Sequence, residues 1–285
     1  MTPENPNVDA AREVVPSSSS FSIDRKTVAA KIDELVRPST FPVAVRFLRK
    51  GEEAPPKARR PLADMQRHVT VCQGWAIARR YGWTTVLRAE DMKCPLGALV
   101  AGFAMPNTFY EEGNLCAGMY TADAAAGARS EAAVERFAPG EIDGIVFGPL
   151  ARVEFEPEIL IIYGNAAQVM RLVAAALYKH GGRIHSSFAA RMDCSDHLVV
   201  PLRSDEPQVI LPCNGDRIFA GAQDEEMAYT TPWSKVGTLV EGLEGTQKGG
   251  VRYPIPSFLT YEPGMPPKYE ELLNMQRDEQ AKAGP

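Results

Sequence analysis

Cysteine is the residue type in this chain best suited to chemistry, because a thiolate can hold a metal or act as a nucleophile. The chain has five cysteines. Four of them fall into two similarly spaced pairs, Cys72 with Cys94 and Cys194 with Cys213. Each pair brackets a short segment that is predicted to form a strand, so the pairs occupy matched contexts.

The second cysteine of each pair is followed closely by a glycine. Cys94 precedes Gly97 and Cys213 precedes Gly215. Glycine allows the backbone to approach a bulky group closely and to present N–H donors to it. The sulfurs of an iron–sulfur cluster need such donors, because hydrogen bonds to sulfur set its reduction potential.

These cysteines could also have a core role or bind zinc. Free cysteine is often only a small buried apolar residue. Structural zinc sites use close Cys-x₂₋₄-Cys pairs, which the sequence lacks, and it also lacks the tight cysteine run of small ferredoxins. Widely spaced ligands require the whole fold to build the site. We therefore predict a [4Fe–4S] cluster held by Cys72, Cys94, Cys194 and Cys213.

Several charged residues near these cysteines could serve the same site. Arg46 lies within an otherwise apolar strand, which calls for an acidic partner, an anionic substrate or an exposed strand edge. His68 precedes Cys72 by one helical turn, and His197 follows Cys194 by nearly one turn. Either histidine could move a proton near the cluster, replace a thiolate or simply be partly buried.

The segment after Cys213 adds a charged pair, Asp216 and Arg217, which could orient a substrate carboxylate or pair internally. Asp193 and Asp196 flank Cys194, where helix capping is the ordinary role of aspartate. We expect Tyr229 and the acidic run 224–226 to lie at the surface.

Hydrophobic patterning predicts alternating helices and strands. We expect helices over 22–36, 68–81, 166–180 and near 130–137, with Gly82 ending the second and Asn165 capping the third. We expect strands over 42–48, 83–89, 144–150, 159–163, 183–188 and 208–211. The fold class is therefore α/β or α+β, with a mixed sheet and helices.

The matched cysteine pairs suggest two pseudo-symmetric halves, 21–143 and 144–250, around a central site. Such an interface is a common location for a cofactor. We expect a disordered tail over 1–20, a single globular domain over 21–262 and a proline-rich extension with a short helix over 263–285.

Seven segments of the chain together carry a resemblance to a known family: Pro42-Val-Ala-Val-Arg-Phe-Leu48, Cys72-Gln73, Cys94-Pro-Leu-Gly-Ala98, Gly148-Pro-Leu150, Tyr163-Gly-Asn-Ala-Ala-Gln-Val-Met-Arg-Leu172, Cys194-Ser-Asp196 and Pro212-Cys-Asn-Gly-Asp-Arg217. Over about residues 25–260 the chain resembles the uncharacterised "ancient conserved region" (ArCR) proteins of archaea and bacteria. It implies that the four paired cysteines are the family's cysteines. Cys116 lies outside the pattern, and the resemblance brings no activity with it.

Composition narrows the functional class. The chain is 45% hydrophobic and 24% charged, with a net charge of −5. This acidic balance argues against nucleic-acid binding, which needs a clustered basic surface. No secretory signal or apolar run of about 20 residues is recognisable, so we expect no membrane association and a cytoplasmic location. Thiols stay reduced there, which favours metal ligands over disulfides.

The leading hypothesis is an enzyme that uses the cluster on a small anionic substrate, by Lewis-acid lyase or reductive chemistry. Arg46 and Arg217 would clamp a carboxylate, and His68 or His197 would handle protons. If only three of the four cysteines bind, the fourth iron is open and acts as the Lewis acid. If all four bind, the cluster is closed and serves electron transfer or a reductive step, with a redox partner. The alternatives are a tetrapyrrole- or corrinoid-binding protein and a zinc-stabilised structural protein. The sequence leaves the oligomeric state open.

Overall fold

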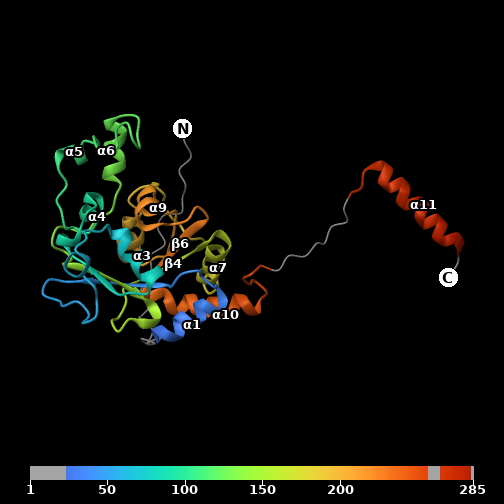
Figure 1. Ribbon diagram of the computed structural model, residues 1–285, viewed down its shortest axis with the longest axis horizontal. Helices are drawn as coiled ribbons and strands as arrows, with labels where there is room; N and C mark the ends of the chain where they lie inside the picture. The colour runs from blue at the N-terminus through green and yellow to red at the C-terminus, as the bar shows by residue number, and fades with distance from the viewer. Residues whose placement is uncertain (1–23, 256–263, 284–285) are drawn as a thin grey trace, which may run out of the picture. The chain divides into compact units, whose positions relative to one another are not determined.

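The computed structural model describes residues 24–255 and 264–283. Over these residues the chain is an α+β protein built on a six-stranded antiparallel sheet with strand order β2-β3-β1-β4-β6-β5 (Figure 1). The strands are β1 (Val43–Leu48), β2 (Thr85–Leu87), β3 (Gly144–Pro149), β4 (Ile159–Asn165), β5 (Gln208–Ile210) and β6 (Glu226–Pro232).

The described helices alternate with these strands irregularly. They are α1 (Arg25–Leu35), α2 (Pro61–Met65), α3 (Val71–Tyr81), α4 (Pro95–Val100), α5 (Thr108–Glu111), α6 (Ala124–Ala132), α7 (Ala166–Leu177), α8 (Val200–Ser204), α9 (Asn214–Ala220), α10 (Val236–Lys248) and α11 (Pro267–Ala283). Short 3₁₀ turns are η1 (Ala89–Asp91), η2 (Leu150–Arg152) and η4 (Trp233–Lys235), and η3 (Ser195–Val199) is a π-helical turn.

Both faces of the sheet are covered, which explains why the central strands are almost wholly apolar. Along β1, Val43, Val45 and Phe47 enter one core, and Ala44 and Leu48 enter the other. This alternation follows from the two-residue period of a strand. Helices α1, α7 and α10 pack on the second face, and α3 packs on the first (Figure 1).

The strand order is symmetric about its centre. Strands β1 and β4 form the central antiparallel pair, β3 and β6 flank them, and β2 and β5 lie at the two edges. The three strands of each set thus occupy equivalent positions, as a twofold axis perpendicular to the sheet would place them. Because β3 completes the first set, the sets divide after β3 rather than at the predicted boundary of 143 and 144.

Helices on the first face repeat in the same way. Helix α3 has Cys72 as its second residue, and the continuous helical stretch 193–204 has Cys194 as its second residue. Each leads into a three-residue edge strand. Cys94 is then the N-cap of α4, and Cys213 is the N-cap of α9. The pairing expected from sequence therefore corresponds to equivalent positions in the two sets.

Several predicted elements are confirmed and others are wrong. Gly82 ends α3 in the left-handed conformation, and Asn165 caps α7 through a capping box. Residues 183–188 form no strand, and the helix predicted near 130–137 is α6, which ends at Ala132. Strand β6 and helix α10 were not predicted. The helix could have been, since Val236, Leu239, Val240 and Leu243 recur at the helical spacing i, i+3, i+4 and i+7.

The C-terminal residues 255–285 form a separate unit. Its described part contains α11, which at 17 residues is longer than the short helix expected there. The predicted disordered tail, 1–20, lies outside the described residues. Among the described helices, none combines the length and the apolar character needed to cross a membrane.

Candidate metal centre

Four cysteines from the two strand sets line one pocket. Cys72, Cys94, Cys194 and Cys213 surround a cavity of about 270 Å³ on the first face of the sheet. Three of them are buried and Cys94 is partly exposed. The fold therefore brings together side chains that are more than a hundred residues apart in the chain.

Direct contacts connect the two cysteine pairs. The Cys72 thiol faces the backbone carbonyl of Gly215, at a sulfur–oxygen distance of 4.0 Å, so it touches the loop that carries Cys213. Burial raises the pKa of Cys194 well above its ordinary value, and Asp193 and the other three thiols act in the same direction. All four thiols line the same pocket.

The first pair has neutral polar partners. The Thr70 hydroxyl lies 2.9 Å from the Cys72 sulfur, and Thr70 also caps α3 through a capping box. The backbone N–H of Gly97 donates to the Cys94 sulfur at 3.4 Å. A Cβ atom at Gly97 would lie 2.9 Å from Cγ2 of Val71, so glycine lets the starts of α3 and α4 approach each other.

The second pair lies beside one carboxylate, that of Asp193. The Cys213 thiol donates to Oδ1 of Asp193 at 3.1 Å, and its backbone N–H donates to Oδ2 at 2.9 Å. Burial, followed by the nearby Asp193 charge, raises the pKa of Cys213 to about 12. Burial also raises the pKa of Cys72. These thiols therefore remain protonated at neutral pH unless a metal displaces the protons.

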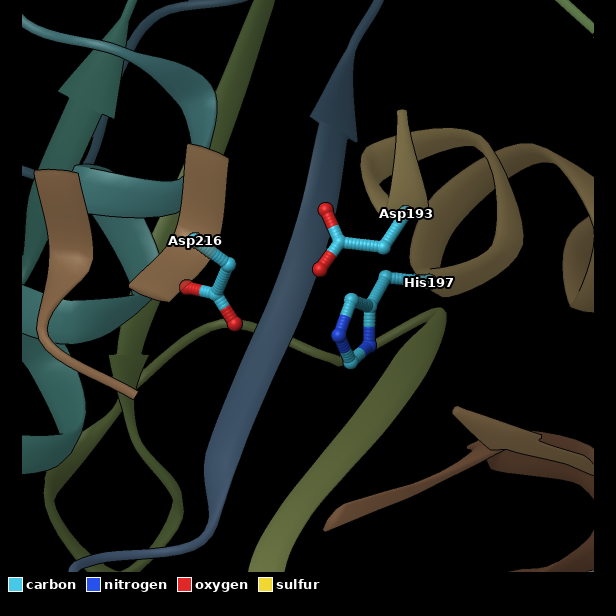
Figure 2. A group of neighbouring side chains, drawn as sticks. All are labelled: Asp193, His197 and Asp216. Atoms are coloured by element: carbon cyan, nitrogen blue, oxygen red, sulfur yellow. The ribbon is translucent and has the colours of Figure 1, made fainter. Parts of the chain in front are cut away.

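A buried polar network lies beneath the pocket. Ligand atoms of Asp193, His197 and Asp216 all lie within 4.8 Å of one another. Figure 2 shows the three side chains converging, Asp216 from α9 and the other two from the helical stretch 193–204. These residues could in principle hold an ion, but their polar atoms already have protein partners.

Those partners fix the protonation of His197. The Tyr163 hydroxyl donates to Asp216 at 2.6 Å, so Nε2 of His197 supplies the proton of its 3.1 Å bond to Tyr163. Nδ1 then accepts from the Thr230 hydroxyl at 2.8 Å. Burial lowers the pKa of His197 to about 3, so the imidazole is neutral at physiological pH.

Two interactions join the strand sets below the pocket. Arg79 of α3 makes a buried bidentate ion pair with Glu226 of β6, with N–O distances of 2.7 and 2.9 Å. The Trp75 indole N–H donates to Asp216 at 3.3 Å. Glu226 and Tyr229, both on β6, are buried. The prediction that these two residues lie at the surface was wrong, because strand β6 was not predicted.

The structure separates the predicted charged residues. His197 and Asp216 lie in the network beneath the pocket. His68 is exposed and precedes the Thr70 cap, so the helical face predicted for His68 and Cys72 does not exist. Arg46 and Arg217 do not line the pocket. Arg46 shares the strand face of Ala44 and Leu48, opposite the cysteines, and pairs with Glu52 at 3.3 Å.

Arg217 is occupied within its own loop, where it donates to the Gln223 carbonyl at 2.6 Å. Sequence reasoning missed Arg191, which lines the pocket and forms a buried bidentate pair with Glu131 at 2.9 Å. Cys116 donates to the same Glu131 at 3.1 Å and does not line the pocket.

Comparison with known proteins identifies the family. A family model described as uncharacterised ArCR, DUF169, matches residues 31–242. The chain belongs to the DUF169 family. An uncharacterised protein of Methanocaldococcus jannaschii is 29% identical over 219 residues, which is 76% of this chain and 92% of that protein. No solved structure matches the chain.

The match confirms the family inferred from the sequence motifs. It includes all four pocket cysteines and the elements that carry them, from β1 to β6. The DUF169 description assigns no activity, so the chemistry of the pocket has to be argued from its residues.

Proposed function

We propose that this DUF169 protein binds an iron–sulfur cluster, of the [4Fe–4S] type, through Cys72, Cys94, Cys194 and Cys213. The proposal depends mainly on one observation. Four cysteines from equivalent positions of two strand sets line one pocket. Buried cysteines that serve only as core residues have no reason to converge from four separate helix starts.

The cysteine sulfurs are not gathered tightly enough, as the structure stands, for one zinc ion. Zinc–sulfur bonds of about 2.3 Å would place tetrahedral ligand sulfurs roughly 4 Å apart. Among the described residues, no cysteine belongs to a group of three potential ligands within 4.8 Å. A cluster holds each cysteine at a different metal atom and so needs a wider arrangement. The zinc-stabilised structural alternative is thereby disfavoured.

The cavity volume weighs against a tetrapyrrole or corrinoid. Pockets for drug-sized ligands measure about 300–1,000 Å³, whereas this cavity measures about 270 Å³. A macrocycle would also need a flat slot with an axial ligand, and the neutral His197 has both ring nitrogens hydrogen-bonded to Thr230 and Tyr163.

The electrostatics of the thiols also favour metal binding over nucleophilic catalysis. A nucleophilic cysteine needs a cationic neighbour or base that lowers its pKa. Here burial raises the pKa of Cys72, Cys194 and Cys213. Iron can deprotonate such thiols by coordination, as every thiolate metal site requires. With all four cysteines bound the cluster would supply electron transfer, and with only three bound it would supply a Lewis-acidic iron for a small molecule in the pocket.

The surrounding residues have orienting roles under this proposal. Once Cys213 binds iron as a thiolate its sulfur no longer donates to Asp193, but its backbone N–H still does, and the Thr70 hydroxyl can donate to the Cys72 thiolate. Such partners outside the metal ligands determine ligand orientation and tune the metal. The predicted clamp of an anionic substrate by Arg46 and Arg217 receives no support, since neither side chain lines the pocket.

Anaerobic purification tests the proposal directly. We expect a brown protein with a broad absorption shoulder that bleaches with dithionite, and with iron and acid-labile sulfide in equal amounts. The quadruple serine variant of the pocket cysteines should be colourless and iron-free. A colourless wild-type protein that contains zinc, or sharp macrocycle bands, would refute the cluster.

A further inference from the structure

The mouth of the cysteine pocket is apolar. Large side chains from three separate segments line it and remain exposed to solvent: Met119 is 73% exposed, Tyr120 42%, Ile218 65% and Phe219 54%, and Leu96 completes the group. Exposed apolar side chains scattered singly are ordinary, but a group that lines one cavity marks a binding site.

Among the described residues, no exposed charged side chain lines this pocket. Its charged residues are Arg191 and Asp193, both buried. The Arg191 guanidinium is paired with Glu131 through two hydrogen bonds, with its buried Nε–H unpartnered among the described residues, and Asp193 accepts two hydrogen bonds from Cys213. An ionised ligand group would therefore lose its hydration without gaining a counter-charge, which is unfavourable.

The aromatic wall of the mouth is held in place. The Arg191 guanidinium lies 5.4 Å from the centre of the Tyr120 ring, and the Asn214 amide donates to the Tyr120 hydroxyl at 3.5 Å. A ring fixed in this way binds a ligand with a small loss of side-chain entropy. Its free face suits the flat surface of another aromatic ring.

We propose that this mouth binds a small, neutral, apolar molecule, preferably aromatic, against Tyr120 and Phe219. The cavity measures about 270 Å³ and the cluster would share it, so the ligand must be small. This inference names a substrate class for the proposed cluster enzyme and so rests on that function. It replaces the anionic substrate expected from the sequence.

A matched pair of probes tests the ligand class. Benzamide and benzoate share the same ring and nearly the same shape, and differ in charge. Titration calorimetry of the anaerobically purified protein should give at least tenfold tighter binding of benzamide. Equal or tighter binding of benzoate, or no binding of benzamide, would overturn the inference.

Surface variants test the location. Ile218→Ser and Phe219→Ser should each weaken benzamide binding about tenfold and keep the fold, because both side chains are more than half exposed. Met170→Ser is the matched control, since Met170 is 42% exposed on α7 and does not line the pocket. Equal effects of all three variants would contradict the assigned site.

Iron analysis of the same samples separates the two proposals. If the protein contains iron but does not bind benzamide, only the proposed ligand class is refuted. Iron-free protein that binds benzamide through Phe219 would refute the cluster alone. In iron-containing protein, benzamide should also change the electron paramagnetic resonance spectrum of the dithionite-reduced sample, and an unchanged spectrum would place the ligand away from the pocket.

Discussion

The two cysteine pairs occupy equivalent positions in the fold but very different surroundings. Cys72 and Cys94 have neutral partners, a hydroxyl and a backbone N–H, and Cys94 is partly exposed. Cys194 and Cys213 are both buried beside Asp193. Symmetry of the backbone therefore does not impose symmetry of the chemistry, and the second pair should hold iron more firmly.

The largest expected effect concerns this difference in iron binding. Cys213→Ala or Cys194→Ala should lose nearly all iron, because each removes a ligand from the enclosed side of the pocket. Cys94→Ala should retain most of it, since solvent or a small thiol can replace a partly exposed ligand. The iron content per protein chain after anaerobic purification measures the loss in each of the three variants. Equal losses in all three variants would show that the two pairs are equivalent.

The contact that joins the two strand sets should dominate stability. Glu226→Gln leaves the buried Arg79 guanidinium without its anionic partner. Breaking a buried pair in this way costs about 3 kcal/mol or more. Urea unfolding should show this loss, whereas Glu52→Gln, which breaks the pair with Arg46 near the surface, should have a much smaller effect. Similar losses in both variants would contradict a special role for the buried pair.

Asp193 should make the second pair sensitive to pH. Burial, and then the charge of Asp216, raise the pKa of Asp193 from 3.8 to about 7. Between these values the folded protein holds a proton that the unfolded chain releases, so this group stabilises the fold at acid pH and the stabilisation is lost as pH rises toward 7.

Asp193→Asn removes that dependence. The difference in free energy of unfolding, variant minus wild type, should increase as pH rises from 4 to 7, by at most about 1.4 kcal/mol per pH unit. Urea unfolding at several pH values, on protein stripped of iron, measures the difference. A constant difference across this range would show that Asp193 titrates normally.

A smaller effect is expected at the equivalent position of the first pair. Thr70→Ala removes the N-cap of α3 and the hydroxyl beside Cys72. Loss of such a cap costs about 1 kcal/mol, with no change in slope between pH 4 and 7. Thermal unfolding at pH 5 and pH 7 tests both statements. A strong pH dependence would mean that the two pairs respond alike.

The smallest effect should come from the fifth cysteine. Cys116→Ala should leave the iron content unchanged, because its thiol is bonded to Glu131 and does not line the pocket. Iron per chain is again the measurement. Loss of iron would require a different set of ligands.

Much of the fold could be predicted from local patterns. The alternation in β1, the Gly82 end of α3 and the Asn165 cap of α7 each depend on residues a few positions apart. Strand β6 could not be predicted, because Glu226 is buried only through its partner Arg79, which lies 147 residues away. Nor could the sequence assign Arg46, since strand period separates two faces without identifying which face carries the site.

The sequence by itself determined that four cysteines recur in two matched pairs, because spacing and neighbouring glycines are local properties. It also determined the family, through motifs that can be read in order along the chain. Only the tertiary structure decided that the pairs meet in one pocket, that Arg46, His68 and Arg217 do not line it, and that its mouth is apolar. These outcomes depend on which distant elements pack together and on which partner each charge finds, and no short stretch of sequence contains that information.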